Sequence, residues 1–198
     1  MDFISASETI IDILRRELKP QLTYHRLEHT LDVCTQADFI SQAEGISNHD
    51  VILVKTAALL HDIGLIYTYE NHEEKGCEIA SEILPSFGYM ATDILKINGM
   101  ILSTKLPQNP KNHLEEILCD ADLDYLGRED FHMLAHRLHF EWKMLGINNL
   151  SLSQWYDLQI RFLGSHQFYT QTAKAKREEI KHRHLVEIKA LCTHFQQT

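Results

Sequence analysis

Glycine residues follow the ends of successive apolar stripes, and this arrangement limits the fold more than any other feature of the sequence. Within a stripe the apolar side chains stand three or four residues apart, as on one face of a helix. Five of the eight glycines lie just beyond such a stripe: Gly45, Gly64, Gly88, Gly127 and Gly146. We expect each to take the left-handed conformation that ends a helix. No segment alternates apolar and polar residues between hairpin turns, so the sequence predicts an all-α fold.

The stripes indicate roughly eight to nine helices in one domain of 198 residues. The first stripe ends at Pro20, the second runs from Leu27 to Gly45, and the third from about residue 48 to 61. Asn71 and Glu74 have the spacing of a capping box, which predicts the start of a fourth helix. Further helices are expected at 91–103, 112–126, 129–145, 152–168 and 171–196.

The charge balance limits the classes of partner that we expect the protein to bind. The chain has 28 acidic and 19 basic residues, a net charge of −9, which repels the phosphate backbone of nucleic acids and anionic membrane faces. Its 13 histidines, together with the carboxylates, supply the nitrogen and oxygen ligands that divalent metals use. We therefore expect no polymeric nucleic acid and no membrane as a partner, and the composition favours a metal site.

Cysteine usage predicts a reducing compartment. The four cysteines stand far apart, form no CxxC pair and follow no secretory signal. The longest apolar run, residues 51–60, contains Lys55 and is about half the length that spans a bilayer. We expect a cytoplasmic protein with free thiols and no membrane segment.

Histidines and aspartates occur together at helix ends in a pattern suited to a metal ion. His61 and Asp62 are adjacent at the end of the apolar helix, directly before Gly64. His25 and His29 are four residues apart and so share one helix face. A later segment adds three carboxylates, at Asp120, Asp122 and Asp124. Such a set can hold a divalent ion and leave positions for water.

In this order, His29, His61-Asp62 and Asp122 resemble the HD superfamily of metal-dependent phosphohydrolases. YHRLEHTLDV at 24–33 is similar to the YHNxxHxxxV signature of HD enzymes and cyclic-nucleotide phosphodiesterases. AALLHDIG at 57–64 resembles the family's HD helix, and CDADLDYLG at 119–127 its last-ligand segment. The resemblance implies an HD core at about 20–145 and a C-terminal helical extension at about 150–198.

The resemblance also implies roles for single residues. His29, His61, Asp62 and Asp122 would hold the metal, with Asp62 able to bridge two ions. The family's final aspartate follows Ala and precedes Leu, which selects Asp122. Asp120 would then orient a ligand or water from behind, or else be a solvated carboxylate.

His25 and His72 carry two further implications of the resemblance. In the phosphodiesterases the histidine of the YHN sequence protonates the leaving group, so His25 would be the general acid. His72 and Gly76 have the HxxxG spacing of the HD-GYP type, in which that histidine contributes to a second metal. The paired histidines of that type are missing, since 101–110 contains none. We therefore expect one ion rather than two, with His72 as ligand, phosphate contact or simple first-turn polar residue.

The sequence indicates the substrate contacts less clearly than the metal ligands. Lys75, Lys105 and Arg128 are candidates for binding phosphate or are solvated surface charges. Tyr24 lines the pocket or belongs to the core. The row His132, His136 and His139 is interpreted as a polar helix flank, and His182 and His184 as part of an exposed terminal helix.

The sequence as a whole predicts a metal-dependent phosphohydrolase or phosphodiesterase that uses a metal-activated water. Its substrate would be a small phosphate ester, a nucleotide or cyclic nucleotide. The metal is Mn, Mg, Fe, Ni or Zn, and the oligomeric state is not predicted. Two alternatives use the same fold: an HD-type di-iron oxygenase, and a non-catalytic nucleotide-binding sensor.

Overall fold

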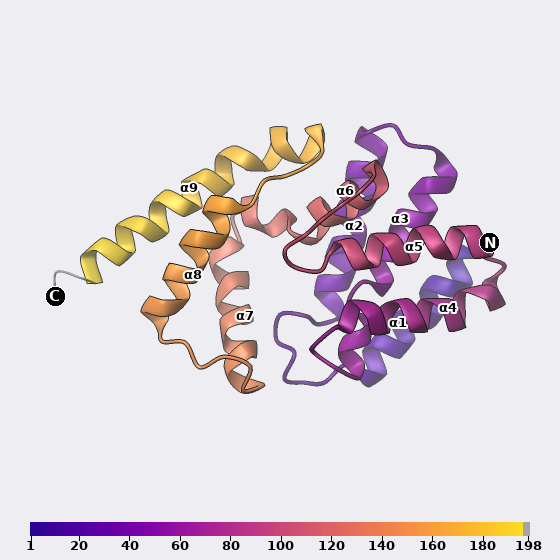
Figure 1. Ribbon diagram of the computed structural model, residues 1–198, viewed down its shortest axis with the longest axis horizontal. Coiled ribbons are helices and arrows are strands. Elements are labelled where there is room, and N and C mark those ends of the chain that lie inside the picture. Colours follow the sequence, from indigo (N-terminus) through magenta and orange to yellow (C-terminus); the bar gives the residue numbers. More distant parts are fainter. Residues whose placement is uncertain (196–198) are drawn as a thin grey trace. The chain divides into compact units, whose positions relative to one another are not determined.

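The computed structural model describes residues 1–195, with side chains to Cys192, and in this part of the chain all regular secondary structure is helical (Figure 1). Nine α-helices are present within it: α1 Phe3–Glu17, α2 Leu27–Ala43, α3 Asn48–Leu60, α4 His72–Ile83, α5 Ala91–Ser103, α6 His113–Asp122, α7 Phe131–Met144, α8 Leu152–Ser165 and α9 Gln171–Phe195. Three short 3-10 helices lie between them: η1 Ile63–Ile66, η2 Leu84–Phe87 and η3 Asp124–Gly127. The prediction of an all-α fold is confirmed.

The described residues form two compact units. The first consists of Met1–Pro20 and His25–Asp122 and contains α1 to α6. The second consists of Gln21–Tyr24 and the chain from Leu123 onward, and contains α7 to α9. The single-domain interpretation stays a prediction.

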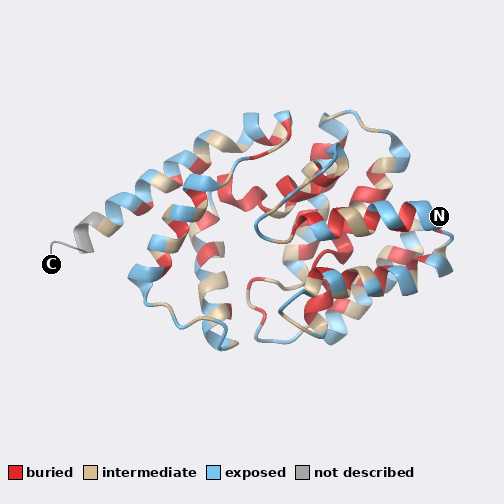
Figure 2. Ribbon diagram, in the orientation of Figure 1, coloured by how far each residue is buried: buried red, intermediate tan, exposed pale blue. Residues whose placement is uncertain are grey.

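Helix α3 lies at the centre of the first unit. Its sequence, NHDVILVKTAALL, is apolar on nearly every face, and eight of its 13 residues are buried. The hydroxyl of Ser47 accepts a hydrogen bond from the Asp50 amide at 3.1 Å, which caps the start of the helix. Because α3 packs against α1, α2, α5 and α6, its last turn ends inside the unit (Figure 2).

Glycine fills two different roles at the helix ends. Gly45, Gly88 and Gly146 have φ values of 68°, 75° and 68°, as expected for left-handed caps. The same expectation is wrong for Gly64 and Gly127, which do not have positive φ. A Cβ on Gly64 would stand 2.0 Å from the carbonyl oxygen of His72, and one on Gly127 would stand 2.4 Å from that of Arg177. These two glycines therefore permit a close approach of two chain segments.

Two other local expectations are wrong. Asn71 precedes α4 in the left-handed conformation, with φ of 55°, and its side chain makes no cap. Its amide oxygen instead accepts a hydrogen bond from Lys105 Nζ at 2.8 Å. The helix expected over 112–126 ends at Asp122, because Leu123 leaves the helical conformation and η3 follows.

Polar groups help to hold the second unit together. The Arg177 guanidinium donates two hydrogen bonds, of 2.7 and 2.9 Å, to the buried carboxylate of Asp124. Trp155 is fully buried, with the ring of His139 stacked on it at 4.9 Å. His184 is also buried, 2% exposed, so its interpretation as part of an exposed helix is wrong. The ring lies flat against Phe131, with the two centroids 4.8 Å apart.

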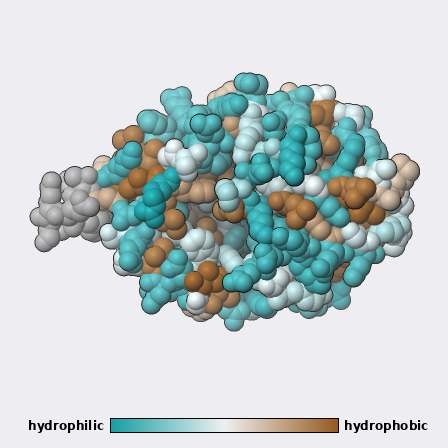
Figure 3. All heavy atoms as spheres, in the orientation of Figure 1, coloured by the Kyte–Doolittle hydropathy of each residue, from teal (hydrophilic) through white to brown (hydrophobic). Residues whose placement is uncertain are grey.

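The surface is mainly polar. On the face shown in Figure 3 hydrophilic residues predominate, and apolar ones occur in small separate groups. None of the described helices combines the length and apolarity that crossing a membrane requires. The four cysteines are all free.

Candidate metal centre

Helix ends of the first unit bring the sequence-predicted ligands together. His29 lies in the first turn of α2, His61 directly follows α3, and Asp62 precedes η1. Asp122 is the last residue of α6, and His72 is the first residue of α4. A helix end fixes the backbone while turning the side chain out of the helical stack, so five residues from four separate segments can point at one place.

Four ligand atoms converge there. His61 Nε2 lies 3.4 Å from His29 Nε2, 3.1 Å from Asp62 Oδ2 and 3.4 Å from Asp122 Oδ1. His29 Nε2 lies 3.3 Å from Asp122 Oδ1 and 3.5 Å from Asp62 Oδ2. Ligands about 2.1 Å from one ion are about 3.0 Å apart at right angles and about 3.4 Å apart at tetrahedral angles. The spacings among His29, His61 and Asp122 match those of atoms around a single divalent ion, and Asp62 Oδ2 lies within 3.5 Å of both imidazole nitrogens.

A backbone carbonyl sets the proton position on His61. Nδ1 lies 2.8 Å from the carbonyl oxygen of Ala58, which can only accept, so Nδ1 carries the hydrogen. In the neutral ring the lone pair is then on Nε2, the atom that faces the cluster. His72 is oriented in the same way: Nδ1 donates to the Tyr69 carbonyl at 2.9 Å, and Nε2 lies 3.3 Å from Asp62 Oδ1. Such second contacts are typical of metal-binding histidines.

Asp62 supplies a direct test of whether an ion fits. Its Oδ2 is buried, and no described residue donates a hydrogen bond to it. His61 Nε2 is 3.1 Å away but does not form a hydrogen bond with this oxygen. A buried carboxylate oxygen without a donor is costly, and a cation between it and the imidazole nitrogens removes that cost. The residues present therefore fit a divalent metal.

The pKa values show how strongly this place favours positive charge. Burial disfavours the charged form of His61, but the close carboxylates of Asp62 and Asp122 hold its pKa well above the usual value. Burial likewise opposes the ionised form of Asp122, and hydrogen bonds from His29 and His61 lower its pKa to about 2. For His72, burial is outweighed by Asp62, which raises the pKa to about 9.

Two aromatic side chains, His25 and Tyr69, lie beside the predicted histidine ligands. The His25 ring is 5.8 Å from that of His29 and 6.5 Å from that of His72. Tyr69 lies 5.9 Å from His25 and 6.2 Å from His72, measured between ring centroids. Sequence reasoning missed Tyr69, because it lies in the loop before α4, where no periodicity or motif marks it.

The predicted phosphate-binding cations of this unit pair with nearby acids. Lys75 Nζ is 2.7 Å from Glu78 Oε2. Lys105 Nζ contacts Glu74 Oε1 at 2.5 Å in addition to Asn71. The role of both lysines as phosphate contacts stays a prediction.

Three more of the predicted residues can be placed. Asp120 is fully buried on α6, which excludes the alternative of a solvated carboxylate. Tyr24 and Arg128 both belong to the second unit. Arg128 donates two hydrogen bonds to Asp130, of 3.0 and 2.6 Å, and Tyr24 packs edge-on against Tyr125.

Comparison with known proteins identifies the family. A family model described as HD domain matches residues 26–124, half of the chain, and this range contains all four predicted ligands. The chain belongs to the HD-domain family. HD domains bind divalent metals, and the group His29, His61 and Asp122 is able to hold one.

One curated protein is similar to part of this chain. An uncharacterized protein from Clostridium beijerinckii is 40% identical over 81 residues, which are 39% of this chain and 51% of that protein. The chain thus spans about half the length of the curated relative that it matches.

Solved structures show the fold at low identity. A predicted HD superfamily hydrolase from an uncultured Thermotogales bacterium is 23% identical, with a TM-score of 0.61 over 96% of this chain and 91% of that one. A protein from Lactobacillus plantarum is 19% identical, with a TM-score of 0.65 over 96% and 98% of the two chains. Bacillus subtilis YpgQ in complex with ADP is 17% identical, with a TM-score of 0.65 over 96% of each chain.

Proposed function

We propose that this HD-domain protein is a metal-dependent phosphohydrolase that acts on a small phosphate ester, a nucleotide or a cyclic nucleotide. The observation that carries the proposal is the convergence of His29, His61, Asp62 and Asp122 within 3.5 Å of His61 or His29 Nε2. A nucleotide is supported by the complex of the similarly folded YpgQ with ADP. One ion rather than two is expected to bind.

A divalent ion in such a site lowers the pKa of water toward neutrality and neutralises the oxygens of a phosphoryl group. The chain contributes the frame for that chemistry. The Ala58 carbonyl keeps Nδ1 of His61 protonated, so that Nε2 stays available as a ligand. His72 Nε2 contacts Asp62 Oδ1, which leaves Oδ2 of that carboxylate turned toward His61 and His29.

His25 is proposed as the general acid. The leaving alkoxide must gain a proton, and the His25 ring lies beside those of His29 and His72 without being one of the four ligands. A positioned acid of this kind contributes about 10²- to 10⁴-fold to the rate. His25 is half-buried, so its ring is reachable from solvent for reprotonation after each turnover.

Lys105 and Lys75 are proposed to contact the phosphate chain. Each now pairs with an acidic neighbour, Glu74 or Glu78, in an exposed ion pair of the kind worth little in water. A bound phosphate competes well for such lysines. Arg128 and Tyr24 are also proposed as substrate contacts, and Asp120 as a group that orients a histidine ligand or a metal-bound water.

The deciding experiment is a hydrolysis screen of nucleotides, cyclic nucleotides and simple phosphate esters with Mn, Mg, Fe, Ni and Zn. We expect release of phosphate or nucleoside monophosphate by the wild type and by His113→Ala, a control that removes an exposed histidine of the same unit. His61→Ala should fall to background. His25→Ala should lose about 10²- to 10⁴-fold in kcat while keeping its metal.

Two results would contradict the proposal. One is product release by His61→Ala at the wild-type rate. The other is no release by the wild type with any of the five metals. Nucleotide binding in the second case would indicate the non-catalytic sensor instead.

A further inference from the structure

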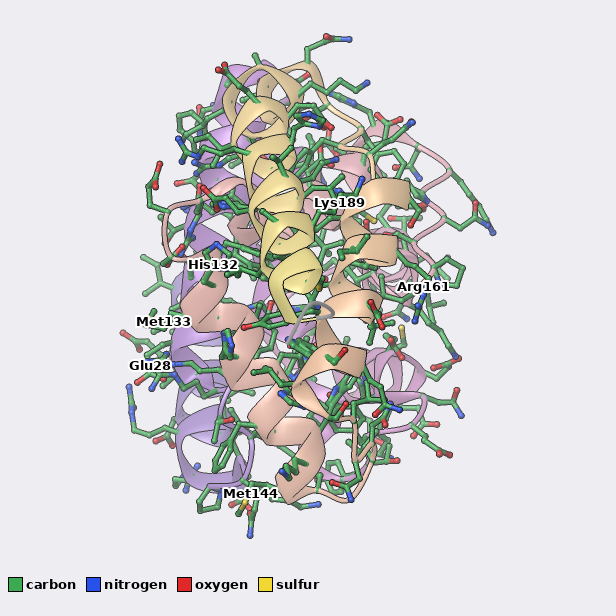
Figure 4. The ribbon with its side chains drawn as sticks, turned by 90° about the vertical axis from the view of Figure 1, so that its left-hand side faces the viewer. Glu28, His132, Met133, Met144, Arg161 and Lys189 are labelled. Atoms are coloured by element: carbon green, nitrogen blue, oxygen red, sulfur yellow. The ribbon has the colours of Figure 1, made fainter. Side chains whose placement is uncertain are left out.

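A second group of metal-binding side chains lies in the second unit. His132 stands in the first turn of α7, where Figure 4 labels it, while His184 and Glu187 lie on α9. One nitrogen of each histidine and one oxygen of Glu187 lie within 4.8 Å of one another. The sequence gives little sign of this group, because 52 residues separate His132 from His184.

The ring of His184 is held in one orientation. Its Nε2 lies 2.9 Å from the carbonyl oxygen of Arg128, which only accepts, so Nε2 carries the hydrogen. Stacking against Phe131 at 4.8 Å and almost complete burial prevent the ring from turning over. In the neutral ring the lone pair is therefore on Nδ1, and that atom lies 3.2 Å from Glu187 Oε2. In that state two acceptors face each other, and either a proton on Nδ1 or a metal ion between them makes the contact favourable.

His132 approaches the same carboxylate oxygen. Its Nε2 lies 3.0 Å from Glu187 Oε2, and its ring is edge-on to that of His184, with centroids 5.3 Å apart. Both nitrogen-to-oxygen distances fall in the range of about 3.0 to 3.4 Å that separates ligands of one zinc-like ion. The side chain of His132 is 40% exposed, so it can rotate to bring the two nitrogens closer.

The neighbouring charged groups leave Oε2 of Glu187 available to a metal ion. Arg183 Nε is 3.8 Å from Oε1, the other oxygen of Glu187, and Arg183 Nη2 pairs with Glu129 Oε1 at 2.6 Å. The guanidinium of Arg128 is bonded to Asp130. Both guanidinium groups are thus partly neutralised by other carboxylate oxygens than Glu187 Oε2.

We propose that His132 Nε2, His184 Nδ1 and Glu187 Oε2 bind a zinc-like divalent transition-metal ion that fastens α7 to α9. Two imidazoles and one carboxylate suit Zn, Co or Ni better than Mg or Ca, which prefer oxygen ligands alone. The Arg128 carbonyl behind His184 is the kind of second contact that orients a ligating ring. The exposed side of the group leaves a fourth position for water.

The test measures bound zinc in a His61→Ala background, which disables the site of the first unit. After dialysis against a fixed free concentration of Zn²⁺, elemental analysis should find one zinc per chain. Adding His132→Ala or Glu187→Gln should weaken zinc binding by at least about tenfold, since each removes a ligand. Adding His182→Ala, which removes an exposed histidine of α9, should change nothing.

The two ligand variants replace partly exposed side chains and should keep their helical circular dichroism, which is recorded alongside. A second measurement is the thermal midpoint with and without Zn²⁺. Zinc should raise it in the His182→Ala control and not in the His132→Ala protein. Absence of bound zinc in the His61→Ala background, or zinc that persists unchanged in both ligand variants, would overturn the proposal.

Discussion

Replacing Gly64 by alanine tests how closely α4 approaches the His61-Asp62 pair. The new Cβ would stand 2.0 Å from the carbonyl oxygen of His72 and 3.0 Å from the amide nitrogen of Gly76, where ordinary contacts begin at 3.4 Å. The start of α4 must therefore move by roughly 1 Å or more, since backbone atoms cannot swing aside as a side-chain tip does. Overpacking of this kind costs about 1–3 kcal/mol, and we expect the upper end of that range.

A comparison with Gly45 makes this prediction sharp. Gly45 has φ of 68°, and a Cβ at this position would meet nothing within 4 Å, so only the backbone conformation matters. There alanine should cost about 1–2 kcal/mol, and asparagine, which tolerates the left-handed region, should cost less. At Gly64 the order should reverse, because asparagine is larger. Urea denaturation of the four variants measures all of these free energies.

The same variants report on the metal centre. Movement of His72 would lengthen the 3.3 Å contact between its Nε2 and Asp62 Oδ1, so Gly64→Ala should also weaken metal binding. Gly45→Ala should bind metal as the wild type does. Better tolerance of asparagine than of alanine at Gly64, or a Gly64→Ala protein as stable as the wild type, would refute a steric role for the close approach.

Three further predictions concern the second unit and the metal. Burial, and to a smaller extent the charge of Lys181, lowers the pKa of His166 from 6.5 to about 4. The stability that depends on neutral His166 is therefore fully present above pH 6.5 and is lost as the pH falls to 4. The loss should be about 3 kcal/mol in urea denaturation, and His166→Leu should lose less; equal losses would contradict the cause. Arg177→Ala leaves the buried Asp124 carboxylate without its two hydrogen bonds and should lower the free energy of unfolding by about 3–5 kcal/mol, whereas a cost below about 1 kcal/mol would show that the pair is dispensable. Mn²⁺ at a hundredfold excess over its Kd should stabilise chelator-treated protein by about 2.7 kcal/mol and leave His61→Ala unaffected; equal stabilisation of both would place the ion elsewhere.

Helix positions could be predicted from the sequence where apolar spacing decides them. The range 91–103 is that of α5, and the expected ends near Gly45 and Gly146 are found. Helix starts depend on partners far away in the chain. Asn71 does not cap α4, because its side chain accepts a hydrogen bond from Lys105, 34 residues later. The sequence around Asn71 does not indicate its contact with Lys105.

The candidate site was predictable to the extent that a motif marks it. His29, His61, Asp62 and Asp122 stand in recognisable segments, and the structure brings their side-chain atoms together. The orienting contacts were not predictable, since a carbonyl such as that of Ala58 belongs to the backbone and has no sequence signature. Their positions follow from where each helix ends.

Likewise, the group in the second unit depends on packing. His184 stands in a charged helix whose apolar face is weakly marked, and only contact with Phe131 and the Arg128 carbonyl reveals it as buried. The spacing of His184 and Glu187 is ordinary on a helix. The third member, His132, comes from α7, so no search along the chain would have joined them.

Because of the short segment Gln21–Tyr24, the chain passes from one unit to the other more than once. This segment lies between α1 and α2 in the sequence yet belongs to the second unit, where Leu22 and Tyr24 are buried. Thr23 donates a hydrogen bond to the Arg137 carbonyl, and the Tyr24 amide donates one to the buried carboxylate of Glu141. A single cut after Asp122 would not give two clean domains. After such a cut Gln21–Tyr24 would remain covalently joined to the first unit while still packed in the second, so nicked protein should stay associated through purification.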